Sequence, residues 1–260
     1  MEYNCGVFDY PTGQHVSIYR KTITRKEKDN VNGNEPENAV KNEHFTKTYQ
    51  NENRTEEQEE HSRTVSLSRT KNKIYNIARS NEWDWFITLT FDREKTDSSY
   101  YDRVTSRLQK FLNNLQQRKC PNLKYLIVPE FHADGINYHF HGLLAQCDGL
   151  NFCYSGHDTK DGKPIFNIPN WKYGFTTATR VTDTKRVSSY ITKYITKESM
   201  IYLKEKNRYY TSRNINRTEA EFHIVDEEDF IKVYGDRITY AKSEKVKIAH
   251  QQINYYELDY

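Results

Sequence analysis

Apolar residues recur with two different periods between positions 66 and 198, and this pattern limits the possible folds more than any other feature. Four segments show the alternation or the short apolar runs of strands: 86–91, 123–129, 138–145 and 174–181. Three segments show the period of amphipathic helices: 66–79, 101–117 and 183–198. The order β-α-β-β-β-α therefore predicts an α+β fold, with helices flanking one antiparallel sheet.

The segment before this pattern differs in composition. Residues 26–60 contain ten acidic and five basic residues, many asparagines and no apolar periodicity. Such a segment cannot bury enough apolar surface to offset its ordering entropy, so we expect a flexible acidic linker over 26–62. Residues 1–25 alternate around a Pro11-Thr12-Gly13 turn, which predicts a β-hairpin that either pairs with the main sheet or stays loose.

The main domain is expected over 63–217, and 218–260 is expected to form an α+β extension of unknown role. In this extension we expect a helix over 219–234, a Gly235-Asp236 turn and a strand over 237–241.

Composition excludes several classes of protein. The mean hydropathy is −0.99, and no segment approaches the roughly 18 apolar residues of a membrane-spanning helix. The four cysteines are too scattered for a disulfide framework and include no Cys-x-x-Cys zinc motif. We therefore expect reduced thiols, no membrane association and a cytoplasmic location.

Tyrosine is unusually frequent, with 21 residues beside 39 lysines and arginines. Aromatic rings that stack on bases, together with cations that contact phosphates, are typical of single-stranded nucleic-acid surfaces. The clearest mixture of the two follows position 200, where the predicted DNA-binding residues are Lys204, Arg208, Tyr209 and Arg213. A solvated basic loop is the alternative interpretation of this segment.

A His-x-His pair, His139 and His141, lies on a predicted strand. Side chains at i and i+2 share a face, so both imidazoles can bind one divalent cation. If Asp134-Gly135 forms a two-residue hairpin turn, Glu130 lies opposite His139 on that face and completes a site for Mg²⁺ or Mn²⁺. His132 shares the face and is the reserve third ligand. Two half-buried histidines that bind no metal are the alternative.

The segment 190–197 contains Tyr-Ile-Thr-Lys twice in succession. A continuous helix would place Tyr190 and Tyr194 on one face, with Lys193 and Lys197 on the adjacent face. A phenol, with a pKa of about 10, is a poor nucleophile unless a nearby cation lowers that pKa. The repeat predicts two catalytic tyrosines supported by two lysines, or alternatively an amphipathic helix that merely packs its tyrosines.

Together these motifs resemble those of the HUH endonucleases, and in more detail those of the rolling-circle replication initiators of phages and small plasmids. Positions 86–91 resemble the first motif, Glu130 with His139-Phe140-His141 the second, and 190–197 the third in its two-tyrosine form. The resemblance spans about residues 63–217. It implies a central antiparallel sheet of about five strands, an RRM-like palm, with the tyrosine helix over the metal histidines.

The resemblance also implies an activity: metal-dependent, site-specific nicking and rejoining of single-stranded DNA through a 5′-phosphotyrosine, which leaves a 3′-OH primer. Expected partners are single-stranded origin DNA, a host helicase and a host DNA polymerase in a bacterial cell, with no small-molecule cofactor. A separate helicase is expected because the sequence contains no Gly-x-x-x-x-Gly-Lys-Ser/Thr motif. Two alternatives stay open: an HUH transposase or relaxase with the same chemistry, and a non-catalytic module that binds single-stranded nucleic acid.

Overall fold

The computed structural model describes residues 1–24, 55–131, 134–246 and 251–260. These residues form two compact units: the larger comprises 9–13 and 64–219, and the smaller comprises the rest of the described chain. Most of the predicted linker, 26–62, lies outside the described residues. Its last part is helical, because helix α1 (Glu56–Arg79) begins at Glu56 rather than at position 66.

The larger unit is built on an antiparallel sheet with the strand order β6-β7-β8-β3-β5-β4-β9. Its strands are β3 (Trp85–Leu89), β4 (Lys124–Phe131), β5 (Tyr138–Ala145), β6 (Cys153–Asp158), β7 (Pro164–Asn167), β8 (Thr176–Arg180) and β9 (Tyr210–Thr211). The predicted α+β class is confirmed. The expectation of about five strands is wrong, since the described sheet has seven. Mostly exposed β6 lacks apolar alternation, and β9 has only two residues, so neither has a strand pattern in the sequence.

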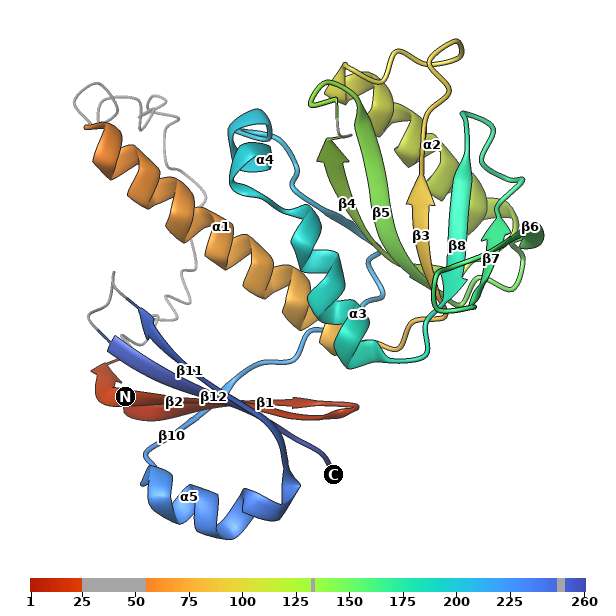
Figure 1. The fold of residues 1–260 in the computed structure, drawn as a ribbon. Coiled ribbons are helices and arrows are strands. Elements are labelled where there is room, and N and C mark those ends of the chain that lie inside the picture. The colour runs from red at the N-terminus through yellow and green to blue at the C-terminus, as the bar shows by residue number, and fades with distance from the viewer. Residues whose placement is uncertain (25–54, 132–133, 247–250) are drawn as a thin grey trace, which may run out of the picture. The chain divides into compact units, whose positions relative to one another are not determined.

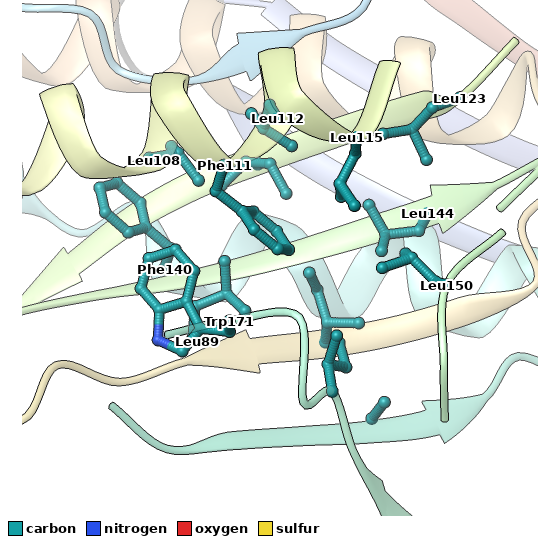
Figure 2. Close-up of a cluster of buried hydrophobic side chains, with 14 of the residues drawn as sticks. Leu89, Leu108, Phe111, Leu112, Leu115, Leu123, Phe140, Leu144, Leu150 and Trp171 are labelled. Carbon is teal, nitrogen blue, oxygen red and sulfur yellow. The ribbon is translucent and has the colours of Figure 1, made fainter. Parts of the chain in front are cut away.

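Helix α2 (Tyr101–Arg118) packs on one face of this sheet (Figure 1). Its buried residues follow the predicted helical spacing, and they include Val104, Leu108, Phe111, Leu112 and Leu115. The alternation in β3 turns Trp85, Ile87 and Leu89 toward the same core. Figure 2 shows Leu108, Phe111 and Leu115 of α2 above the strand that carries Phe140 and Leu144.

The opposite face of the sheet is covered by α1, α3 (Thr184–Ile191) and α4 (Lys197–Tyr202) (Figure 1). Ile74 and Ile77 of α1 pack there beside Ile191 at the end of α3. Leu126 of β4 and Leu143 of β5 form the sheet side of this second core. The sheet is thus buried on both faces, and polar side chains at its surface lie where the helices leave room.

The predicted continuous helix over 183–198 is wrong. Asp183 caps α3 by accepting a hydrogen bond from the Arg186 N–H (2.9 Å), and a 3₁₀ turn, η1 (Thr192–Tyr194), follows. The chain then restarts as α4 after Thr196, whose hydroxyl accepts from the Ser199 N–H (3.2 Å) while the Ser199 hydroxyl accepts from the Thr196 N–H (3.0 Å). Because this reciprocal cap starts a new helix, Tyr190 and Tyr194 do not lie on one α-helix.

The smaller unit contains a sheet with the strand order β10-β1-β2-β12-β11. Its elements are β1 (Glu2–Tyr10), β2 (Gly13–Thr24), β10 (Glu221–His223), α5 (Glu227–Tyr234), the 3₁₀ turn η2 (Gly235–Arg237), β11 (Ile238–Val246) and β12 (Gln251–Leu258). The N-terminal hairpin is present, but the expectation that it joins the main sheet or stays loose is wrong. It pairs instead with β10 and β12 from the C-terminal segment.

The C-terminal segment also differs from expectation in its elements. A strand, β10, occupies the start of the predicted helix over 219–234, and α5 begins only at Glu227, after the Asp226 cap. The strand predicted over 237–241 is longer, and the sequence pattern missed β12. No helix within the described ranges is both long and apolar enough to cross a membrane.

Candidate active site

The strand register brings the predicted metal-binding residues to one face of the sheet. Glu130 of β4 pairs with His139 of β5, as predicted, and Val128 pairs with His141. On the other side of β5, Thr88 of β3 pairs with His141. Part of the predicted turn and the reserve ligand His132 lie outside the described residues. Because i and i+2 share a face, His139 and His141 project to the side covered by α1 and α3.

Both ring nitrogens of His141 have partners. Its Nε2 lies 2.6 Å from Oε2 of Glu130, and its Nδ1 lies 3.1 Å from the Thr88 hydroxyl oxygen. A hydroxyl can donate or accept, so Thr88 supports either neutral tautomer of the imidazole. These two contacts fix the plane of the ring and aim Nε2 at the carboxylate.

The three predicted ligands have the chemistry for a divalent cation, with two imidazole nitrogens and one carboxylate oxygen. Two of these donors, on His141 and Glu130, converge at 2.6 Å, and the third residue, His139, is the strand partner of Glu130. Across the described part of the chain, no three His, Cys, Asp or Glu side chains gather closely enough to hold a metal ion. The donor types, shared face and register fit a cation, and a small movement of His139 and Glu130 would assemble the set.

The ring of Tyr194 stacks on His141, with centroids 3.6 Å apart and planes inclined by 12°. Phe86 of β3 lies beside both rings, with its centroid 6.1 Å from each. Burial, together with a hydrogen bond from Tyr190 and the nearby Glu130 carboxylate, raises the pKa of Tyr194 well above its usual value. Tyr194 is therefore held over His141 as a neutral phenol.

Tyr190 belongs to the same aromatic cluster but faces solvent more. Its ring lies 5.5 Å from that of Tyr194 at 86°, and its side chain is 43% exposed. The Lys193 ammonium lies 5.3 Å from the centre of the Tyr190 ring. Lys197 is exposed at the first turn of α4, one helix further along the chain than the predicted single-helix arrangement placed it. The structure thus brings both tyrosines to the sheet histidines but gives them different environments.

The four predicted DNA-binding residues fall into two groups. Arg208 donates to the Ser66 hydroxyl (2.7 Å) and the Thr70 hydroxyl (3.0 Å), and so ties its segment to α1. Tyr209 is half-buried against the core beneath α1. Lys204 and Arg213 are exposed, and they stay candidates for direct contact with nucleic acid.

Sequence reasoning missed the two β3 residues that contact the site, Phe86 and Thr88. Both lie on one face of the alternating 86–91 strand, and alternation alone identified that face without saying what it meets. The pairing of β3 with β5 places Thr88 directly against His141. Only the sheet order, which the sequence pattern left open, reveals this contact.

Residues 84–199 match the model of a family of replication-associated proteins, those of the ORF2 type. The matched range includes β3, Glu130, both histidines and both tyrosines. No curated protein and no solved structure matched the chain. The match indicates a role in DNA replication, consistent with a rolling-circle replication initiator.

Proposed function

We propose that this protein initiates rolling-circle replication by nicking and rejoining single-stranded DNA at the cluster of His141, Glu130, Tyr190 and Tyr194. The observation that carries the proposal is the stacking of Tyr194 on His141, with Tyr190 beside it. A tyrosine that served only packing would not need to lie over a histidine that is itself oriented by a carboxylate and a hydroxyl.

The proposed step is an in-line displacement at a DNA phosphate. The phenol oxygen of Tyr190 or Tyr194 forms a bond to phosphorus, and the bond from phosphorus to the 3′ oxygen of the preceding nucleotide breaks. The phenol proton passes to solvent or to a neighbouring base, and the departing 3′ oxygen takes up a proton. The products are a 5′-phosphotyrosine and a free 3′-OH, and reversal of the same step rejoins the strand.

His139, His141 and Glu130 would hold a divalent cation, Mg²⁺ or Mn²⁺. When bound, such an ion stabilises the negative charge that develops on the phosphate oxygens. Thr88 keeps the His141 imidazole in the plane needed for this role through its contact with Nδ1. The Lys193 ammonium beside the Tyr190 ring would favour the phenolate of that residue.

Two tyrosines would permit two successive strand transfers. Their rings lie 5.5 Å apart and their side chains are hydrogen-bonded, so both hydroxyl groups can reach one phosphate after a small shift. A second nucleophile can then cut a new strand while the first still holds the 5′ end. A host DNA polymerase would extend the released 3′-OH, and a host helicase would separate the strands.

The proposal is tested by incubating the full chain with 5′- and 3′-labelled single-stranded DNA and Mn²⁺, followed by denaturing electrophoresis. A pool of phage and plasmid origin sequences serves as substrate. We expect a covalent adduct that carries only the DNA 3′ of the cut, and we expect EDTA to abolish it. The Tyr190→Phe/Tyr194→Phe double variant keeps both rings and removes both oxygens, so it should form none.

The outcome also separates the alternatives. DNA binding without any adduct, at any metal concentration, would support the non-catalytic binding module. An adduct that forms on transposon ends or transfer origins but not on replication origins would support the transposase or relaxase. An adduct in the double variant would remove both tyrosines from the chemistry.

A further inference from the structure

A polar cleft of about 570 Å³ lies at the other side of the sheet, between α2 and the edge formed by β4 and β9. Its lining residues are Gln109, Leu112, Asn113, Gln116, Pro121, Asn122, Tyr125, Tyr210, Thr211, Arg213 and Asn214. This volume is within the range of small-molecule sites. We infer that the cleft binds one nucleotide of the single-stranded DNA and reads its base, an inference that rests on the proposed function.

The helix wall of the cleft is a stripe of amides. Gln109, Asn113 and Gln116 follow one another at i, i+4 and i+7, so they share one face of α2. Their side chains make no hydrogen bond within the described ranges of the chain. A primary amide presents a donor and an acceptor side by side, which is the pattern that matches the edge of a nucleobase.

The floor of the cleft is aromatic. Tyr125 of β4 and Tyr210 of β9 are both half-buried against the α2 core. The Tyr210 hydroxyl is hydrogen-bonded to that of Tyr101 (2.8 Å), which holds its ring in place. Base stacking on an aromatic ring contributes about 1–3 kcal/mol in single-stranded complexes. Fixed rings beside free amides thus supply both a stacking surface and a hydrogen-bonding edge.

The charge of the cleft suits a phosphate. Arg213 is exposed at its rim, and its guanidinium lies close enough to the Tyr125 hydroxyl to oppose, in part, the rise in pKa that burial causes there. None of the described residues that line the cleft is acidic. A guanidinium at the rim, amides on the wall and rings on the floor match the phosphate, edge and face of one nucleotide.

Strand β4 connects this cleft to the candidate active site. Tyr125 and Glu130 lie on the same strand, five residues apart, or about 17 Å at roughly 3.4 Å per residue. They point to opposite faces of the sheet, and the two-residue strand β9 is the described edge between them. A single strand that passes over this edge could place one base in the cleft, a few nucleotides from the cut phosphate.

The test compares two matched double variants of the full chain. Asn113→Ala/Gln116→Ala removes amides from the cleft, whereas Asn114→Ala/Gln117→Ala removes the same residue types one position further along the same helix, outside it. Each protein is equilibrated with a pool of randomised single-stranded DNA in EDTA, and the bound DNA is sequenced. Binding in EDTA is measured without cleavage, so this result does not depend on the covalent chemistry.

We expect the wild-type chain and the control variant to share a base preference at one position, on the order of tenfold. The cleft variant should lose that preference and bind a homopolymeric dT strand about as tightly as the wild type. An unchanged preference in the cleft variant, its loss in both variants, or no preference in the wild type would each overturn the inference. Absence of an adduct in the cleavage assay would instead overturn the proposed function alone.

Discussion

The Tyr194 ring lies flat on the His141 imidazole, at 3.6 Å between centroids, while Tyr190 stands at 86° to it and is more exposed to solvent. The two tyrosines of the repeat therefore differ in burial, in contacts and in the pKa of the phenol. Burial raises the pKa of Tyr194, and its hydrogen bond with Tyr190 acts in the same direction. Equal spacing to a following lysine does not make the two residues equivalent.

This difference predicts unequal single variants. Tyr194→Phe should retain most of the initial rate of adduct formation, because the exposed Tyr190 beside Lys193 is the readier nucleophile. Tyr190→Phe should lower that rate by about tenfold or more and still form some adduct through Tyr194. Single-turnover gels with Mn²⁺ measure both rates. Equal rates in the two variants would contradict the assigned asymmetry.

A second prediction concerns the orientation of His141. Thr88→Val preserves the shape of the side chain and removes the hydroxyl that contacts Nδ1, so Mn²⁺ affinity should fall about tenfold. Thr177→Val is the control, since Thr177 pairs with Thr88 on β8 and lies one strand further from the histidine. Calorimetric titration with Mn²⁺ measures the affinities. A Thr88→Val protein that binds Mn²⁺ like the wild type would show that the hydroxyl does not position the ring.

A third prediction separates two arginines that look alike in sequence. Arg208→Gln removes two charged hydrogen bonds to α1 and should lower the free energy of unfolding by about 2 kcal/mol. Arg213→Gln should leave stability unchanged, because Arg213 is exposed, and should weaken binding of single-stranded DNA. Urea denaturation and fluorescence anisotropy with a dT oligonucleotide give the two quantities. Equal losses of stability would show that the contacts of Arg208 contribute nothing.

A fourth prediction concerns the thiols. Burial raises the pKa of Cys5 to about 11 and that of Cys147 to about 12, and Cys120 is also buried, whereas Cys153 is exposed. At pH 8 only about one in a thousand Cys5 thiols would be ionised, so it should react slowly. Ellman's reagent should therefore modify one thiol quickly in the native protein and four in guanidinium chloride. A fast reaction that persists in Cys153→Ser would contradict this assignment.

The sequence predicted the parts of the site that depend on local geometry. The pairing of Glu130 with His139 followed from an expected short turn and the two-residue period of strands, and the structure confirms it. The tyrosine segment was predicted wrongly because its apolar stripe continues through Ile195 although its backbone does not. Thr196 and Ser199 form a cap there, and a capping signal inside an apolar period gives two competing patterns.

Contacts between distant segments could not be predicted. The N-terminal hairpin has a clear local pattern, but its partner strands lie more than 200 residues further along the chain and carry mixed polar sequences. The role of Arg208 was equally hidden, because its partners Ser66 and Thr70 are polar residues on a helix that the sequence showed only as an apolar stripe.

The pairing of the hairpin with the C-terminal strands has a consequence for how the chain acquires its structure on the ribosome. Tyr19 of β2 pairs with Ile253 of β12, so β2 emerges long before its partner is made. All strands of the seven-stranded sheet, by contrast, lie between residues 85 and 211. Domains fold as units during synthesis, so the sheet that carries the histidines can form while residues 1–24 still wait for their partners. The tyrosine cluster would then be assembled before translation ends, and the five-stranded sheet would be completed last.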